Sequence, residues 1–227
     1  MKGKVSKNKF LKVVLPALLV VAIICQAVGF QAVLAKGNVA TTSSDSISNL
    51  TDQQLQALTN PILQSYKADS SHKVWKMTDD SRLAVLANQT NIENARLQEV
   101  VKLVNSEFVE KEIISSPLAM VYAQEKDVSY GDILIDIDQT SSITSSSNSK
   151  EAYKITIGEN GVRLTGASEN AIMHGLRTIQ NLIITNDGLV YGEIVDYPNV
   201  AERRVHVDCA RKYISKDWFI RQIREMS

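Results

Sequence analysis

Apolar residues recur at helical spacing in two stretches of the chain. The first stripe consists of Leu97, Val100, Val101, Val104 and Phe108, and the second consists of Ile172, Leu176, Ile179 and Ile183. Such spacing places the members of each stripe on one face of a helix. Ser168 precedes the second stripe, and a serine side chain at that position can cap a helix. The pattern therefore predicts two amphipathic helices.

Alternation of apolar and polar residues predicts strands elsewhere. Residues 132–138 put isoleucines on one face and mostly aspartates on the other. This arrangement predicts a half-buried strand on which Asp136 and Asp138 face solvent. Residues 153–157 and 162–164 also alternate, and the Gly-Glu-Asn-Gly sequence between them predicts a β-hairpin.

Weaker patterns complete the expected domain. Short strands are expected over residues 74–77 and 188–195. A helix-like stretch over residues 51–66 has Thr51 as its N-cap, and Pro61 is expected to break or kink it. Together these elements predict an α+β fold, a small α/β sandwich in which helices cover a mostly antiparallel sheet.

A new pattern begins after Pro198. Residues 203–209 are expected to form a strand, and Ser215 opens a predicted amphipathic helix. The apolar face of that helix consists of Phe219, Ile223 and Met226. No Gly, Pro or turn cluster ends the helix before Ser227, so the end of the chain interrupts it. One strand and one helix cannot form a core alone, so residues 199–227 are expected to be the first β/α unit of a larger fold.

The amino terminus has the pattern of an export signal. Residues 1–12 carry five lysines and no acid, and a mostly apolar run follows over residues 13–28. We expect a signal peptide over residues 1–35, cut after Ala35, and hence a secreted or cell-surface protein. An uncleaved membrane anchor is the alternative. Residues 36–70 are expected to be a flexible or helical lead into the domain.

The charge of the chain is segregated. Lys and Arg number 25 and Asp and Glu number 25, so without the five lysines of residues 1–12 the body has 20 basic and 25 acidic residues. Nucleic-acid binding needs clustered basic residues. The acidic body therefore argues against nucleic acid as a partner.

Other common chemistries lack a motif. The histidines, which are His72, His174 and His206, lie far apart and form no zinc motif, and no phosphate-binding loop is present. The sequence thus predicts neither a metal nor a cofactor. Two carboxylate pairs, Glu193 with Asp196 and Asp136 with Asp138, offer acid–base chemistry in principle. Alternation places the second pair on the solvated face of its strand.

Five stretches together resemble glycoside hydrolase family 20, the β-N-acetylhexosaminidases. They are EAYKI (151–155), GVRLTGA (161–167), HGLRTIQNL (174–182), IVDYP (194–198) and RRVHVDCARKY (203–213). The resemblance implies that residues 71–198 are the small α/β domain that precedes the barrel in this family. It also implies that residues 199–227 begin a (β/α)8, or TIM, barrel that is truncated here.

The last stretch carries the site residues that the resemblance implies. The family's first barrel strand has an Arg, four residues, an Asp, two residues and a second Arg, which correspond to Arg203, Asp208 and Arg211. The second Arg, here Arg211, holds sugar hydroxyls; a surface Arg paired with an acid is the alternative. Asp208 either accepts hydrogen bonds from Arg211 or is solvated at a strand end. Arg203 is expected at the domain junction, and His206 is expected to be packed or solvated.

The resemblance implies a secreted hydrolase that removes β-linked N-acetylhexosamine from glycans, with the substrate's own acetamido group as nucleophile. Its catalytic Asp-Glu pair lies on a later barrel strand, so no catalytic residue is assigned in this chain, and the missing barrel is an implied partner. Arg204 replaces the usual Gly after the first Arg, and the neighbouring Glu202-Arg203 and Arg211-Lys212-Tyr213 suggest that this departure belongs to the lacto-N-biosidase-like branch. The alternative function is a secreted noncatalytic α/β module for glycan binding or domain packing.

Overall fold

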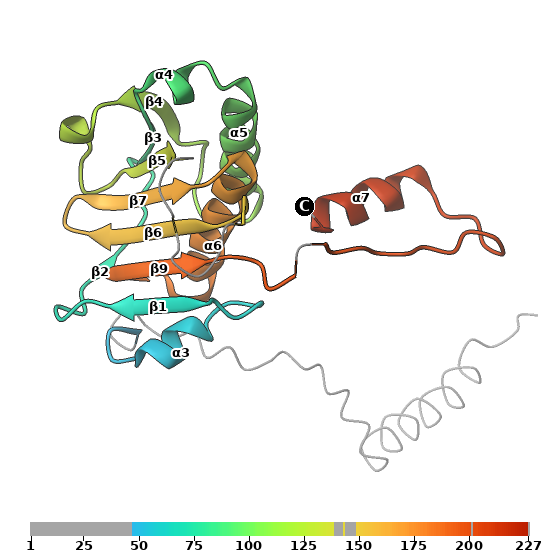
Figure 1. Ribbon diagram of the computed structural model, residues 1–227, viewed down its shortest axis with the longest axis horizontal. Coiled ribbons are helices and arrows are strands. Elements are labelled where there is room, and N and C mark those ends of the chain that lie inside the picture. The colour runs from blue at the N-terminus through green and yellow to red at the C-terminus, as the bar shows by residue number, and fades with distance from the viewer. Residues whose placement is uncertain (1–46, 139–142, 144–148, 201, 227) are drawn as a thin grey trace, which may run out of the picture. The chain divides into compact units, whose positions relative to one another are not determined.

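The computed structural model describes residues 47–138, 143, 149–200 and 202–226 (Figure 1). The predicted signal peptide over residues 1–35 and its cleavage site lie outside these residues. Within the predicted lead, helix α3 (Asp52–Gln56) and strand β1 (Ser65–Ala68) are formed. Thr51 caps α3 through a capping box with Gln54, as the sequence predicts, although the helix is shorter than expected and ends before Pro61.

The main sheet has seven strands in the order β1-β9-β6-β7-β5-β3-β4 (Figure 1). Besides β1, they are β3 (Arg82–Leu86), β4 (Ala119–Ala123), β5 (Ile133–Ile137), β6 (Tyr153–Gly158), β7 (Gly161–Gly166) and β9 (Gly192–Asp196). Neighbours from β1 to β7 are antiparallel, and neighbours from β7 to β4 are parallel. The predicted packing of helices on a sheet is confirmed, but the mostly antiparallel sheet is wrong because the fold is mixed α/β.

The parallel half of the sheet has a clear physical origin. Strands β3 and β4 are adjacent and joined through helices α4 (Gln89–Ile92) and α5 (Ala95–Glu110), and a helical crossover makes two strands parallel. The sequence pattern did not reveal β3 because Leu83, Ala84 and Val85 are all buried. A strand buried on both faces is a continuous apolar run and shows no alternation.

Strand β5 corrects a second prediction. All its residues are buried, so Asp136 is not solvated as the alternation suggested. Ile133 and Ile135 join the main core, whereas Leu134 packs with Ala84 and Ala123 in a separate small cluster. The face expected to meet solvent is therefore covered.

The predicted hairpin is confirmed as β6 and β7. Gly158 pairs with Gly161, which leaves Glu159 and Asn160 as the turn. Gly161 has φ +92°, and a Cβ there would lie 2.6 Å from the carbonyl oxygen of Asp132. Only glycine satisfies both the backbone angle and the close approach.

Both predicted amphipathic helices are present and lie side by side on one face of the sheet (Figure 1). Helix α5 carries the first stripe, which is entirely buried. Helix α6 (Glu169–Asn186) carries the second stripe, in which only Ile183 is partly exposed, and the predicted cap Ser168 accepts from Ala171 N. A short 3₁₀ helix, η1 (Glu125–Asp127), follows β4.

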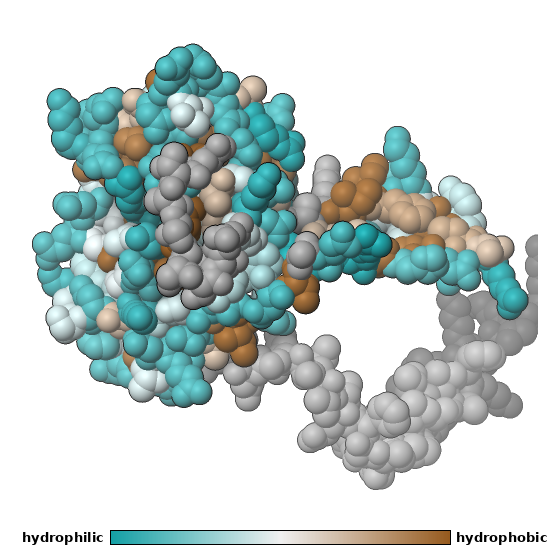
Figure 2. Space-filling model, in the orientation of Figure 1, coloured by the Kyte–Doolittle hydropathy of each residue, from teal (hydrophilic) through white to brown (hydrophobic). Residues whose placement is uncertain are grey.

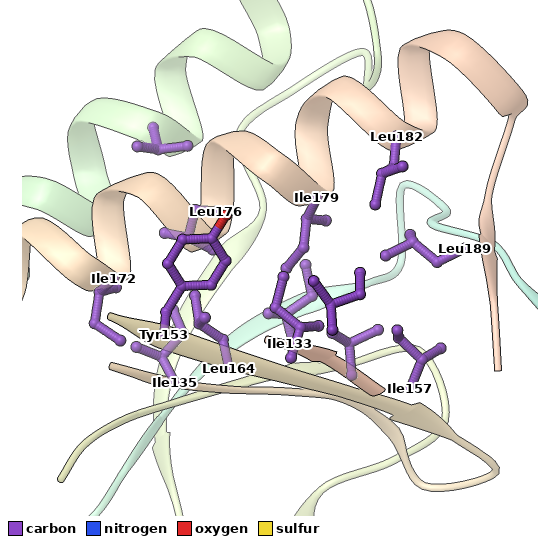
Figure 3. Packing of buried hydrophobic residues seen from close by; sticks show 14 of the residues in the cluster. Ile133, Ile135, Tyr153, Ile157, Leu164, Ile172, Leu176, Ile179, Leu182 and Leu189 are labelled. Atoms are coloured by element: carbon purple, nitrogen blue, oxygen red, sulfur yellow. The ribbon is translucent and has the colours of Figure 1, made fainter. Parts of the chain in front are cut away.

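The core lies between α6 and the centre of the sheet (Figure 3). Leu176 and Ile179 of the helix meet Ile133, Ile135 and Leu164 of strands β5 and β7. Each of these side chains is fully buried. Burial of one such side chain stabilises the fold by about 1.5–3 kcal/mol.

The expected strand over 188–195 is split. Strand β8 (Leu189–Val190) pairs with β2 (Val74–Trp75) in a separate two-stranded sheet, and β9 continues in the main sheet. Gly192, at the start of β9, has φ +150°, and a Cβ there would lie 2.1 Å from the carbonyl oxygen of Lys67. The glycine lets the chain change sheets at this point.

The carboxyl-terminal segment differs from expectation in one element. Helix α7 (Lys216–Met226) is formed as predicted. Residues 203–209 form no strand, so this prediction is wrong for the described structure. A strand is stable only with ladder partners, and no strand among the described residues pairs with these. Their assignment to a barrel stays a prediction.

Candidate functional site

The two predicted site residues, Arg211 and Asp208, are exposed in the segment 202–213, which lacks strands. The Asp208 Oδ1 atom accepts a hydrogen bond from the backbone N–H of Ala210 at 2.8 Å. This bond closes a local turn. Within this described segment, Arg211 donates no hydrogen bond to Asp208. The sugar contact expected of Arg211 stays a prediction.

Arg203 links the same segment to the domain. Its Nη2 donates to Glu151 Oε2 at 2.6 Å, and its Nη1 donates to the carbonyl oxygen of Val200 at 3.3 Å. Glu151 stands two residues before β6, so the ion pair connects the chain after β9 with the start of β6. The role expected for Arg203 at a junction between two domains stays a prediction. His206 is exposed.

A polar network lies where β9 ends and the segment leaves the domain. The Tyr153 hydroxyl donates to Asp196 Oδ2 at 2.8 Å and lies 2.6 Å from Thr178 Oγ1. The backbone N–H of Gln64 donates to Asp196 Oδ1 at 3.1 Å. One carboxylate thus ties β9 to β6 and to the residue before β1, and the tyrosine extends the link to α6. The network fixes the end of β9.

The chemistry of this network is structural. Burial raises the pKa of the Tyr153 hydroxyl well above its ordinary value, and the negative charge of Asp196 acts in the same direction. The phenol therefore remains a neutral donor. Glu193, the proposed acid–base companion of Asp196, stands three residues earlier on the strand and so points to the opposite face. It pairs with Lys154 instead, at 3.7 Å.

His174 on α6 lies near the Arg203–Glu151 pair and near Asp196. Burial lowers the pKa of its imidazole below 6.5, and the charges that act on it include Glu151, Arg203, Arg177 and Asp196. Desolvation penalises the charged imidazolium, so the ring is neutral at pH 7. A neutral ring does not compete with Arg203 for the carboxylate of Glu151.

Sequence reasoning assigned no site role to Glu151, Tyr153, His174 or Thr178, although all four stand in the stretches that carried the resemblance. A signal was present for one of them. Tyr153 stands at an inward position of a predicted strand, and a buried tyrosine needs a partner for its hydroxyl. Its partners come from distant parts of the sequence, so only the fold identifies them.

The second carboxylate pair is also not a reactive pair. Asp136 Oδ1 accepts from the side-chain amides of Asn88 at 3.3 Å and Asn91 at 3.1 Å, and Oδ2 accepts from Arg163 at 3.3 Å. Both oxygens are therefore engaged. The bonds tie β5 to the α4 region and to β7, which is a structural role.

The described residues lack two further features, a metal-binding cluster and a membrane span. Among the residues that the structure describes, no group of three His, Cys, Asp or Glu side chains is arranged to hold a metal ion. Within the same part of the chain, no helix is long and apolar enough to cross a membrane.

Comparison with known families gives one match over most of the domain. Residues 60–197 match glycosyl hydrolase family 20, domain 2. This stretch begins before β1, ends after β9 and contains the network of Asp196, Tyr153, Thr178 and Gln64, whereas Arg203 lies beyond it. A curated relative, Beta-hexosaminidase B of Pseudoalteromonas piscicida, is 30% identical over 76 residues, which are 33% of this chain and 10% of the relative.

Solved structures show the same fold. A chitobiase of Flavobacterium johnsoniae superposes with a TM-score of 0.59 at 16% identity, over 78% of this chain and 26% of that protein. The N-acetyl-beta-hexosaminidase of Streptomyces plicatus gives 0.55 at 17% identity, over 78% of this chain and 33% of that protein. The chain thus spans about a tenth of the curated relative and between a quarter and a third of these structures.

Proposed function

Because the chain belongs to glycosyl hydrolase family 20, we propose that it is the amino-terminal portion of a secreted glycosidase that removes β-linked N-acetylhexosamine from glycans. The observation that carries the proposal is the match of residues 60–197, more than half of the chain, to the family's domain 2. The relative named a beta-hexosaminidase supports the class of sugar. A Streptomyces plicatus beta-hexosaminidase of this fold has been solved with GlcNAc as its product, which agrees with that class.

The proposed reaction is substrate-assisted hydrolysis with retention of configuration. The carbonyl oxygen of the 2-acetamido group forms a bond to the anomeric carbon while the glycosidic C–O bond breaks. A glutamic acid gives its proton to the departing oxygen, and water then opens the intermediate. We assign this glutamic acid and its neighbouring aspartate to one barrel strand that follows residue 227.

The proposed contribution of this chain to the sugar site is Arg211. A guanidinium presents a rigid fork of N–H donors, which suits two neighbouring hydroxyl groups of a sugar ring. Barrel enzymes place such side chains at the carboxyl ends of their strands. Exposure of Arg211 in this chain is consistent with a side chain whose partners lie in the substrate and in the following barrel.

The finer specificity is a separate part of the proposal. Arg204 stands where the family usually has glycine after the first arginine. We therefore place the enzyme in the branch that releases a lacto-N-biose-type disaccharide. Comparing the release of N-acetylglucosamine and of lacto-N-biose from aryl glycosides by the full-length protein separates the two specificities.

The proposal is tested by nitrophenol release from an aryl N-acetyl-β-glucosaminide and from an aryl lacto-N-bioside. The 227-residue protein is assayed beside the protein extended through the downstream coding sequence. We expect activity in the extended protein and none in the short chain. Arg211→Ala in the extended protein should raise KM, whereas Arg96→Ala, which removes an exposed arginine from α5, should leave KM unchanged.

The noncatalytic module is the second candidate, because one observation favours it. Residues 47–200 contain a continuous hydrophobic core that includes α3, both long helices and the main sheet. A domain with its own core can fold without a barrel. A folded short chain, together with an extended protein inactive on both glycosides, would replace the hydrolase proposal with this one.

A further inference from the structure

We propose that Arg203 is a positioning residue for Arg211, and that its ion pair with Glu151 holds the segment 202–213 on the domain. The inference rests on the proposed sugar contact of Arg211. It concerns how that side chain is presented, which the family match does not address.

Hydrogen bonds anchor the main chain that leads to the segment. Asp196 is fixed by Tyr153 and by the backbone of Gln64. The Gln64 side-chain Nε2 donates to Asn199 Oδ1 at 2.7 Å and to the carbonyl oxygen of Tyr197 at 3.3 Å. The main chain is therefore anchored by hydrogen bonds as far as Asn199.

Arg203 provides the next anchor along the chain. Its bond to Glu151 joins residues 52 apart in sequence. The other hydrogen bonds that the structure describes for residues 202–226 are local, such as those of Arg204 to Glu202 and of Ala210 to Asp208. When the ion pair is broken, the last anchor before Arg211 is Asn199. When the ion pair is formed, the last anchor is Arg203, which is closer to Arg211, so Arg211 can reach fewer positions.

The strength of this anchor follows from its exposure. The side chains of Arg203 and Glu151 are 51% and 29% exposed. An ion pair of this kind shifts an equilibrium by about 1.4- to fivefold and weakens in salt. The ion pair therefore favours the position in which the segment contacts the domain, but the segment still populates other positions. Such a weak contact leaves the segment able to pack against a following domain.

The chain carries its own reporter for this motion. Cys209 is exposed and lies between Arg203 and Arg211. In a Cys25→Ser background it is the only thiol, so a nitroxide spin label attached there reports the mobility of the segment. In the 227-residue protein, Glu151→Gln and Arg203→Gln should each raise the mobile fraction by about 1.4- to fivefold, the range that an exposed ion pair allows.

Matched variants distinguish the ion pair from general loosening. Glu159→Gln removes the same charge from another exposed pair, with Lys73, and should leave the label unchanged. The exchange Glu151→Arg with Arg203→Glu should restore low mobility, and 1 M salt should loosen the wild-type segment as the single variants do. Equal mobility in Glu151→Gln and Glu159→Gln, or failure of the exchange to restore order, overturns the proposal.

The mobility of the spin label is measured without glycosidase activity. An inactive extended protein would therefore refute the proposed function and leave the test of the ion pair unaffected. In an active extended protein, Arg203→Gln should raise KM with little change in kcat, since Arg203 acts through the position of Arg211. The charge exchange should bring KM back. A fall in kcat at unchanged KM contradicts the positioning role.

Discussion

Two neighbouring residues of α6 fix the helix on two sides. His174 faces the junction, where burial and the charges of Glu151 and Arg203 act on its ring. Gly175 faces the sheet, where a Cβ would lie 2.3 Å from Leu164 Cδ1 and 3.2 Å from Tyr153 Cδ2. The helix therefore approaches β6 and β7 as closely as its backbone allows. Small changes at either position should move the helix relative to the junction.

Stability should depend on pH through His174. Its pKa is below 6.5 in the folded state because burial disfavours the imidazolium, whereas the unfolded chain takes up the proton near pH 6.5. The stabilisation is therefore fully present above about pH 6.5 and is lost as pH falls through the folded-state pKa. Chemical denaturation between pH 7.5 and 5 should show this decline, and His174→Gln should reduce it. An equal decline in the variant would assign the effect to another group.

Gly175→Ala should destabilise the fold by about 1–3 kcal/mol, the usual range for overpacking a core. The new methyl group would force α6 away from Leu164, and the cost would appear as a lower midpoint of urea unfolding. Gly158→Ala is the control, because nothing lies within 4 Å of a Cβ at that position. Similar midpoints for the two variants would show that the helix has room to shift.

At the scale of elements, α5 and α6 are joined by polar contacts along their shared edge. Arg177 makes two hydrogen bonds to Glu107, with Nη2 to Oε1 at 2.7 Å and Nε to Oε2 at 3.1 Å. Lys111 Nζ donates to Gln180 Oε1 at 2.5 Å. The Gln180 Nε2 atom is buried, and the described residues give it no hydrogen-bond partner. The two hydrogen bonds from Arg177 to Glu107, called here the arginine fork, are therefore the main polar contact along this edge.

Loss of the arginine fork should cost more than loss of a surface pair. Both side chains are under one-fifth exposed, so Glu107→Gln should lower the free energy of unfolding by about 1.5–3 kcal/mol. Glu159→Gln breaks the Lys73 pair, whose side chains are 58% and 76% exposed, and should lower the free energy of unfolding by clearly less. Urea unfolding at pH 7 compares them directly. Equal costs would mean that the helix edge is solvated in solution.

The elements that could be predicted are those whose pattern is local. Helices α5 and α6 and the β6–β7 hairpin follow from apolar spacing and turn residues, so the sequence located them. Strand β3 and the two-sided burial of β5 could not be predicted, because neighbouring layers create that burial. The same limit applies to the site. Arg211 and Asp208 came from a motif, whereas the contacts of Tyr153 and Glu151 join residues far apart in sequence.

At the scale of the whole molecule, the described chain has one well-buried part and one exposed part. The core joins residues from α3 to β9, and the residues of 202–213 are nearly all exposed. Hydrophobic residues appear on the surface of the carboxyl-terminal segment in Figure 2. Those that are most exposed are Val205 (66%), Tyr213 (88%), Ile223 (60%) and Met226 (54%). An apolar helix face of this kind needs a partner in water.

This contrast predicts where proteases should cut. Segment 202–213 has no ladder or core contacts, so trypsin should cleave the 227-residue protein at Arg203, Arg204, Arg211 or Lys212 well before it cleaves the domain. In the extended protein, a following barrel should bury α7 and the segment, and these sites should become resistant. Mass spectrometry of timed digests identifies the cuts, and Lys126 in exposed η1 is the internal reference within the domain. Resistance in the 227-residue protein would show that residues 202–226 pack against the domain without a barrel, which would contradict this prediction.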